Sequence, residues 1–205
     1  MTQLPQRRSR AQMQEETRSR LIEAANDIIA EGGVAAASIR GVCERAGFSP
    51  GAFYSNFADK EELLLALLEQ QMHAAIREIE DLMARMVGGS LDEDLSLLAA
   101  RLQELGDQPV PARLTIELYL HARRDPNFAA HLDRLRAAYH TDFARLLDGL
   151  AARHGVKWQV PPLHLSQMLH TLWTGYVVQS PNDRPSLADA LNIICHATID
   201  FPQDD

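Results

Sequence analysis

The chain has 205 residues, of which 46% are hydrophobic and 23% charged, and it carries a formal net charge of −8. This composition is typical of a folded protein and excludes wholesale disorder. The first twenty residues are too polar for a signal peptide, and no uncharged apolar run approaches the ~20 residues that cross a bilayer. We therefore expect a cytoplasmic protein without membrane contact.

The charge is distributed unevenly along the chain. Residues 1–60 carry eight Lys or Arg against seven Asp or Glu, whereas the remaining residues carry twelve against twenty-one. A basic end on an acidic body is expected where only that end meets a polyanion. The first twenty residues contain five arginines: Arg7, Arg8, Arg10, Arg18 and Arg20.

Helical periodicity extends over nearly the whole chain, and no segment shows the alternation of a strand. Capping residues and glycines punctuate this pattern near the N-terminus. The expected helices there are Met13–Glu31, ended by Gly32-Gly33, then 38–46, capped by Ser38 and ended by Gly47, and a third begun by Ser49-Pro50.

A long fourth helix is expected from Asp59, which forms a capping-box-like start with Glu62. The same kind of signal marks the later helices, and residues 106–111 form an expected turn. Those helices are expected from Ser90 to about Leu105, then to about Arg124, from Asp125-Pro126 to about His154, from Pro161-Pro162, and from Ser186 to near Phe201.

The pattern predicts an all-α protein of about nine helices, with a small three-helix head and a larger helical body. We divide it into a basic flexible arm (1–12), a head (13–60) and a body (61–205). Cys43 and Cys195 lie far apart in helical patterns, which indicates reduced and buried thiols rather than a disulfide.

Residues 37–57 read ASIRGVCERAGFSPGAFYSNF and join two short helical runs through the turn 46–49. The second run is too short to be stable alone. This is the pattern of a helix-turn-helix, in which the start of the second helix reaches base edges in DNA. Gly51 and Ala52 leave room for close approach to a groove. Short helices around a glycine turn also occur in other all-α proteins, so spacing alone leaves that alternative open.

A longer comparison strengthens the DNA-binding reading. The segments IEAANDIIAEGG and ASIRGVCERAGFSPGAFYSNFADKEELLLALL contain an Ala-Gly turn, a Gly-x-Phe-Tyr step, a closing Phe and a Lys-Glu helix start. At these spacings the run 18–68 resembles the N-terminal domain of the TetR/AcrR family of bacterial transcriptional regulators. The resemblance covers about a quarter of the chain, and the rest is similar only in the number and length of its helices.

Three departures from the family pattern are visible. Ser38 stands where threonine is commoner, Phe48 where valine is usual, and 41–43 reads Gly-Val-Cys where an Asp-Ile-Ala-like run is usual. None removes a needed contact, although Gly41 weakens its helix by up to ~1 kcal/mol relative to alanine.

The resemblance implies that the head (13–60) binds DNA and that the body (61–205) binds a ligand and forms the dimer. Ser38, the Tyr54 hydroxyl and Lys60 are expected at phosphates, which fix register without reading sequence. Arg40 is expected to reach a base or the backbone, and both remain open. For the arginines of the arm, a DNA contact and a solubilising role also both remain open. The expected base-reading residues are Ser49, Pro50, Gly51, Ala52, Ser55 and Asn56.

The resemblance also implies a homodimer formed by the last two long helices, although an intramolecular core explains their apolar faces equally well. The candidate interface residues are Leu165, Leu169, Leu172, Tyr176, Leu187, Leu191, Ile194 and Thr198. A pocket for a small, largely hydrophobic effector is expected in the body. Its candidate lining is Met86, Leu102, Leu118, Tyr119, Phe128, Tyr139, Phe143, Met168 and Trp173.

The implied function is a repressor that binds an inverted-repeat DNA operator as a dimer and is released when the effector shifts the fourth helix. An activator, or a regulator controlled by a protein partner, is the alternative. No Gly-rich phosphate loop, nucleophile elbow or HExxH motif is present, so we expect no catalysis, no cofactor and no metal site.

Overall fold

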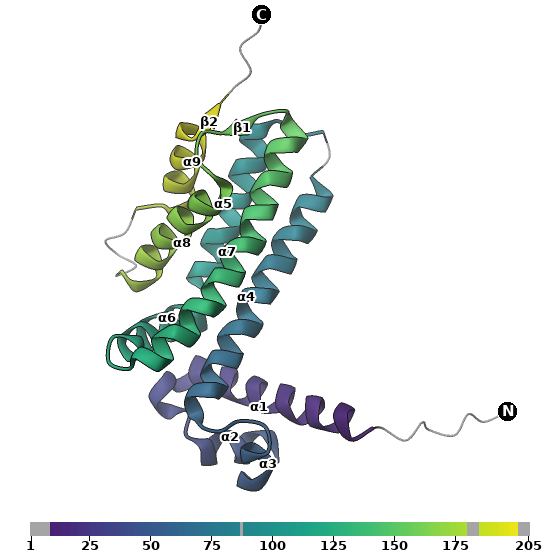
Figure 1. Cartoon of the computed structure of the whole chain (residues 1–205), viewed down its shortest axis with the longest axis vertical. Helices are drawn as coiled ribbons and strands as arrows, with labels where there is room; N and C mark the ends of the chain where they lie inside the picture. Colours follow the sequence, from purple (N-terminus) through teal and green to yellow (C-terminus); the bar gives the residue numbers. More distant parts are fainter. Residues whose placement is uncertain (1–8, 87, 180–184, 201–205) are drawn as a thin grey trace, which may run out of the picture. The chain divides into compact units, whose positions relative to one another are not determined.

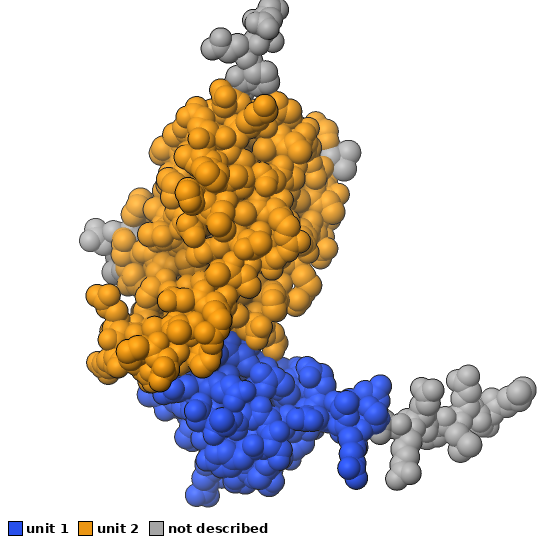
Figure 2. Space-filling view, viewed as in Figure 1, with its two compact units in different colours: residues 1–68 blue, residues 69–205 orange. Residues whose placement is uncertain are grey.

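The computed structural model describes residues 9–86, 88–179 and 185–200. The chain forms two compact units, residues 1–68 and 69–205, which Figure 2 colours separately. The division falls eight residues beyond the expected head–body boundary at 60/61. Among the described residues no helix has both the length and the apolar character needed to cross a bilayer.

The first unit is wholly helical in its described part (Figure 1). Its last element, α4, continues into the second unit. The elements are α1 (Arg10–Gly32), the 3₁₀ turn η1 (Val34–Ala36), α2 (Ile39–Ala46), α3 (Pro50–Tyr54) and the beginning of α4 (Lys60–Arg85).

Helix α1 begins earlier than the sequence indicated. Ser9 accepts a hydrogen bond from the Gln12 amide, and the Gln12 side chain accepts one from the Ser9 amide, which completes a capping box. The expected flexible arm over residues 1–12 is therefore wrong for 10–12, which are helical. Arg7 and Arg8 lie outside the described residues.

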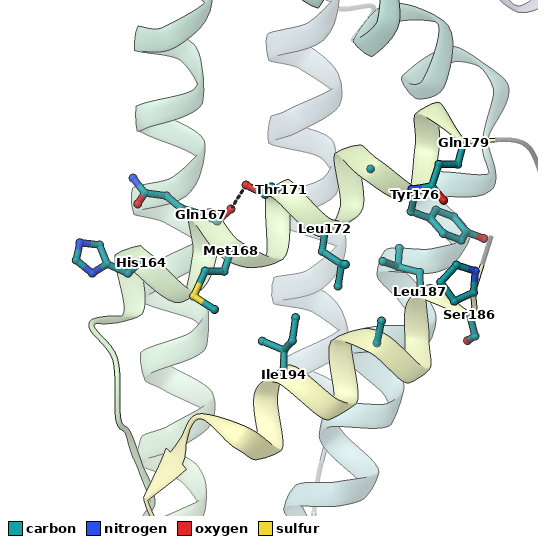
Figure 3. A pocket seen from close by; sticks show the side chains of 13 residues that line it. His164, Gln167, Met168, Thr171, Leu172, Tyr176, Gln179, Ser186, Leu187 and Ile194 are labelled. Carbon is teal, nitrogen blue, oxygen red and sulfur yellow. Dashed lines mark hydrogen bonds between the residues drawn. The ribbon is translucent and has the colours of Figure 1, made fainter. Parts of the chain in front are cut away.

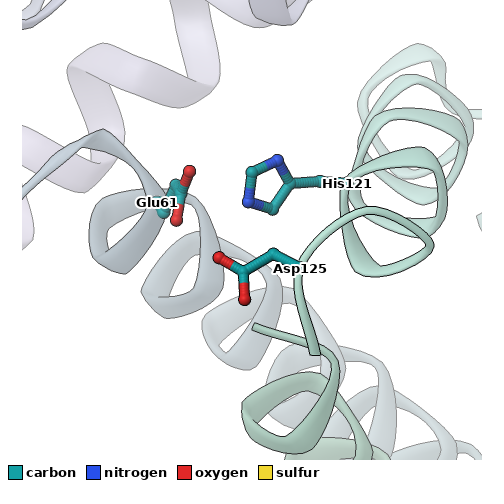
Figure 4. A group of neighbouring side chains, drawn as sticks. All are labelled: Glu61, His121 and Asp125. Carbon is teal, nitrogen blue, oxygen red and sulfur yellow. The ribbon is translucent and has the colours of Figure 1, made fainter. Parts of the chain in front are cut away.

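The starts of the next helices follow the expected caps. The Ser38 and Ser49 hydroxyls accept from the backbone amides of Gly41 and Ala52, in the first turns of α2 and α3. Asp59 accepts from the Glu62 amide in the same way. Glu61, labelled in Figure 4, adds negative charge to the first turn of α4, where it favours the helix dipole.

Large apolar side chains fill the core of the first unit. Leu21 and Ile29 of α1 are fully covered, as are Phe53 of α3 and Phe57 beyond it. The two phenylalanine rings lie 5.5 Å apart. Fully burying one such side chain stabilises a fold by about 1.5–3 kcal/mol, so these contacts hold helices that are marginal by themselves.

The second unit contains the rest of α4 and five further helices among the described residues (Figure 1). They are α5 (Leu91–Asp107), α6 (Pro109–Ala122), α7 (Pro126–His154), α8 (Pro162–Val178) and α9 (Leu187–Ala197). Helices α5 and α9 pack together, as do α7 and α8.

Two features of this unit differ from expectation. Strands β1 (Lys157–Trp158) and β2 (Ile199–Asp200) pair antiparallel, although no strand was expected. A two-residue strand is too short to show alternation. The expected turn over 106–111 is reduced to Gln108, because Gly106 remains in α5 and Pro109 begins α6, a position that proline tolerates.

Helix α7 is anchored at both ends. At its start Asp125 accepts from the amides of Asn127 and Phe128, and it lies one short turn after His121 of α6 (Figure 4). At its end Arg153 donates to the Met83 and Met86 carbonyls of the α4 terminus. His154 contacts the buried carboxylate of Asp94 at 2.8 Å in α5.

Cys43 and Cys195 are buried free thiols, as the sequence indicated. Burial raises the pKa of Cys195 to about 12. The pKa of Cys43 is also raised, first by burial and then by the negative charge of Glu44.

Candidate functional site

The first unit contains a helix-turn-helix. Helix α2 ends at Gly47, whose φ of +74° is a conformation that glycine adopts without strain. The Phe48 amide then returns to the Cys43 carbonyl at 2.9 Å, which closes the turn. Ser49 caps α3 two residues later, so the connection is short and fully hydrogen-bonded.

Helix α3 presents a row of small and polar side chains to the outside. Ser49, Pro50, Gly51, Tyr54 and Ser55 are exposed, whereas Ala52 is half-buried. The Ser55 hydroxyl donates to the Gly51 carbonyl within the helix, at 2.9 Å. These residues are therefore available to a partner, as expected of base and phosphate contacts.

Asn56 lies differently. It is half-buried, and its side-chain amide donates to the Ala52 carbonyl at 2.8 Å. Its own carbonyl accepts from Arg18 of α1. A base contact by Asn56 thus requires its side chain to leave the helix end, and its expected role at adenine stays a prediction.

Gly51 has no internal reason to be glycine. It lies in helical backbone without a positive φ. A Cβ placed there meets nothing nearer than the Ser49 hydroxyl at 3.6 Å, an ordinary contact. The unit itself would accept a side chain at this position, so its absence leaves open space in front of α3.

The residues expected at phosphates differ in their present contacts. Ser38 is exposed at the start of α2. Arg40 is exposed and pairs with Glu44 at 2.8 Å, which raises the pKa of Arg40 through the hydrogen bond and the charge. Lys60 donates to the Val34 carbonyl at 2.7 Å, so its ammonium lies beside η1.

Comparison with known proteins agrees with this geometry. The family model described as "Bacterial regulatory proteins, tetR family" matches residues 21–67, which contain the whole helix-turn-helix. The helix-turn-helix unit is thus similar to that of the TetR-family regulators.

Two regulators of known name are also similar to this chain. The regulator UidR of Escherichia coli K12 is 34% identical over 65 residues, which are 32% of this chain and only 33% of UidR. The match to this relative thus spans about a third of its length. The nicotine-responsive transcriptional repressor HdnoR of Paenarthrobacter nicotinovorans is 28% identical over 191 residues, 89% of this chain and 94% of HdnoR.

The fold is shared with solved structures. A Mesorhizobium loti MAFF303099 protein assigned to the TetR-family regulators superposes with a TM-score of 0.70 at 17% identity. The superposition covers 93% of this chain and 96% of that chain, so both units share the fold of that protein.

The expected pocket residues fall into separate places in the second unit. Met86 lies at the end of α4 beside Arg153, and Met168 is exposed on α8. Leu118 and Phe128 are buried in α6 and α7. The remaining residues lie in or beside one aromatic group: Leu102, Tyr119, Tyr139, Phe143 and Trp173.

That aromatic group encloses two histidines the sequence reading did not assign. The rings of His140 (α7) and His170 (α8) lie 5.0 Å apart. Tyr139 and Trp173 lie edge-on or tilted against His170, at 5.5 and 6.0 Å. We call Tyr139, His140, Ser166, His170 and Thr174 the polar cluster.

Several atoms of the polar cluster are buried without a hydrogen-bond partner among the described residues. They are His140 Nε2, Ser166 Oγ and Thr174 Oγ1. Leaving such an atom unsatisfied costs about 1–3 kcal/mol. A water or a ligand that reaches these atoms would recover that free energy. The sequence did carry a signal, because the polar residues 166, 170 and 174 repeat every four residues along one helix.

Burial also sets the charge state of the cluster. It lowers the pKa of His170 to about 3, with further contributions from His140 and Arg136. The pKa of His140 is lowered by burial and by Arg136, and burial raises the pKa of Tyr139 to about 12. At neutral pH the cluster is therefore uncharged, with Arg136 beside it stacked 3.9 Å over Tyr119.

The second unit also has an apolar groove of about 580 Å³ between α8 and α9 (Figure 3). Met168, Leu172 and Ile194 face each other across it. None of the described residues that line it is Asp, Glu, Lys or Arg.

The expected interface residues are divided between this groove and the core. Leu165, Leu169 and Leu191 are covered by the chain itself and belong to the hydrophobic core. Tyr176 and Leu187 line the groove but are largely covered, and Thr198 bonds to the Ile194 and Cys195 carbonyls. The apolar steps in the sequence thus identified mainly residues that the chain's own core covers.

The outward face of these helices carries apolar side chains that the sequence reading did not select as interface residues. Ile193 is 69% exposed and Met168 is 45% exposed. Leu163 and Val178 of α8 are also exposed. Large apolar residues gathered on two neighbouring helices are typical of an interaction surface.

The buried histidines predict how stability of the second unit depends on pH. Below about pH 6.5 the unfolded state binds a proton at His170 that the folded state refuses until about pH 3. Stability should thus fall as the pH falls through this window. Replacing His170→Leu should remove up to about 2 kcal/mol of the loss between pH 7 and 5.

Urea unfolding at each pH measures this effect. Tryptophan fluorescence reports the second unit alone, because Trp158 and Trp173 both lie in it. His131→Leu, an exposed position on α7, is the control for loss of a histidine. Identical pH slopes for the parent and His170→Leu would contradict the prediction.

Proposed function

We propose that this protein is a transcriptional repressor that binds an inverted-repeat DNA operator as a homodimer and releases it on binding a small, largely apolar effector. The observation that carries the proposal is the exposed, capped α3 with a vacant position at Gly51, in a head that matches the TetR family model. HdnoR, whose name denotes a ligand-responsive repressor, supports repression over activation.

In this proposal α3 is the recognition helix and lies in the major groove. Its exposed N-terminal residues Ser49, Pro50 and Gly51 approach base edges, and the half-buried Ala52 methyl is suited to a thymine methyl. Ser38, Tyr54 and Lys60 are proposed to fix the register on phosphates, and Arg40 requires only the loss of an exposed ion pair to join them.

Gly51→Leu separates folding from DNA binding. The side chain has free space in the isolated unit and leucine is the better helix former, so thermal stability should be equal or higher. The same side chain would hold α3 away from a groove floor, so affinity for DNA should fall at least about a hundredfold, equivalent to about 2.7 kcal/mol.

The DNA ligand for this test is a duplex selected by the parent protein from a random pool. Gly51→Ala is the matched control and should show an intermediate loss. Recovery of an inverted repeat supports a dimeric reader, and its half-site spacing gives the separation of the two recognition helices. Unchanged affinity of Gly51→Leu for that duplex contradicts the assigned role of α3.

Dimerisation is proposed to use the outward face of α8 and α9. The groove there is apolar, and its described lining has no formal charges of one sign that a two-fold axis would bring together. Leu172 and Ile194 remain partly accessible and stay within the proposed interface, whereas Leu165, Leu169 and Leu191 support it from the core.

Met168→Glu should convert the dimer to a monomer, because a symmetric interface receives the unpaired carboxylate twice. Size-exclusion chromatography with light scattering measures the mass. Leu120→Glu on α6 is the control at a similarly exposed leucine, 51% against 45% for Met168, and should leave the mass unchanged. A Met168→Glu protein that stays dimeric excludes this face.

The effector is proposed to bind at the polar cluster. Its aromatic rings offer flat apolar contact, and its unpartnered nitrogen and hydroxyl atoms offer hydrogen bonds to one or two polar groups. Because the histidines are neutral, an uncharged or weakly polar aromatic heterocycle fits best. HdnoR is named for nicotine, whose pyridine ring is a heterocycle of this kind, whereas its pyrrolidine nitrogen is largely protonated at neutral pH.

Nicotine is therefore the first probe for release of the selected duplex. Thr174→Val and His140→Leu should raise the concentration for half-release by roughly tenfold, since each removes a hydrogen bond worth about 1–1.5 kcal/mol, while affinity for DNA without the probe stays as in the parent. Leu97→Val, at an exposed position of α5, is the control. If neither cluster variant changes the concentration for half-release, the effector binds elsewhere. If neither nicotine nor related heterocycles release the duplex, control by a protein partner is favoured.

A further inference from the structure

Arg18 of α1 is used inside the first unit, although it belongs to the basic N-terminal sequence. Its Nη1 donates to the Asn56 carbonyl at 2.9 Å. Its guanidinium carbon lies 4.3 Å from the centre of the Phe57 ring. One guanidinium therefore makes a charged hydrogen bond and a cation–π contact to two successive residues.

Arg20, two residues later, makes the same pair of contacts to a different element. Its Nη2 donates to the Ala46 carbonyl at 2.7 Å, and its guanidinium carbon lies 4.7 Å from the centre of the Phe48 ring. Residues two apart on a helix point about 200° away from each other, so α1 sends one arginine to each side.

Both carbonyls lie at the carboxyl end of a helix of the helix-turn-helix. Ala46 is the last residue of α2, and Asn56 follows the end of α3 at Tyr54. Carbonyls at these ends lack intrahelical donors and carry partial negative charge. A guanidinium satisfies both needs, and the phenylalanine that follows each helix covers its face.

We propose that Arg18 and Arg20 are positioning residues that clamp the ends of α3 and α2 and thereby set the direction of the recognition helix. They act on DNA affinity through geometry rather than by neutralising phosphates. The proposal rests on the proposed function only for its DNA readout, because the clamp itself exists in the free protein.

The alternative is that these arginines contact phosphates, as a basic N-terminal sequence suggests. The two roles differ in salt dependence. Each lost phosphate contact lowers the slope of log K against log salt by about 0.9 for duplex DNA, whereas a displaced recognition helix weakens operator binding more than unspecific binding.

The experiment compares Arg18→Met, Arg20→Met and Arg18→Lys with the parent. Arg45→Met is the matched control, because Arg45 also links α1 and α2, through an exposed ion pair to Glu31 at 2.7 Å without ring stacking. Exposed ion pairs contribute little to stability, so the amide exchange rates and the DNA affinity of Arg45→Met should stay within about twofold of the parent's.

The first readout is amide hydrogen exchange in the free protein, measured by NMR. The amides of Ser55 and Phe57 bond to Gly51 and Phe53 and report the end of α3. Arg18→Met should accelerate their exchange roughly tenfold, as expected for loss of a charged hydrogen bond. Arg18→Lys keeps the charge but loses the planar face, so it should recover little.

The second readout is affinity for the selected duplex and for a random duplex at several salt concentrations. Arg18→Met should lower the affinity for the selected duplex roughly tenfold, with an unchanged salt slope. Its affinity for the random duplex should change little. Equal weakening of both duplexes with a reduced slope, or full recovery by lysine, overturns the clamp. Where the methionine variant fails to fold, Arg18→Lys carries the same comparison.

The two proposals fail differently. A parent protein that selects no DNA sequence contradicts the proposed function, and amide exchange in the free protein still decides whether the clamp exists. Unchanged exchange at Ser55 and Phe57 in Arg18→Met contradicts the clamp even where the parent binds its selected duplex tightly.

Discussion

The structure of the head depends on contacts that stabilise α3, because this helix is too short to be stable by itself. Helix α3 has five residues, far fewer than a helix needs to be stable in water. Burial of Phe53 and Phe57 anchors one side of it, and the α1 arginines reach the helix ends that packing leaves open. The exposed side is then free of structural duties and can be small and polar.

The fold was largely predictable because its signals are local. Caps such as Ser49, Ser90 and Ser186 and the glycine at 47 mark helix ends through bonds made within a few residues. The outward-facing Ser49 and Tyr54 were expected from the resemblance to the TetR/AcrR family. What failed was either very short, like the β1–β2 pair, or too weakly marked, like the box that starts α1 at Ser9.

Contacts between distant residues were not predictable in the same way. An arginine near the N-terminus looks basic and solvated in sequence, and only the fold shows the Arg18 guanidinium against Phe57. For α8 the periodicity selected Leu165 and Leu169, which the chain's own core covers, because the apolar spacing does not say what the apolar face packs against. The spacing on α8 could have indicated three members of the polar cluster, but the contact between His140 and His170 joins two helices, α7 and α8, and only the fold shows it.

The two buried cysteines have a practical consequence. Thiol reagents attack the thiolate, and burial keeps Cys43 and Cys195 protonated and covered at neutral pH. A cysteine introduced on the surface of the head would therefore be modified selectively without first removing the native ones. Spin or fluorescent labels attached at such a site would report the spacing between the two heads of the proposed dimer, without replacement of the native cysteines.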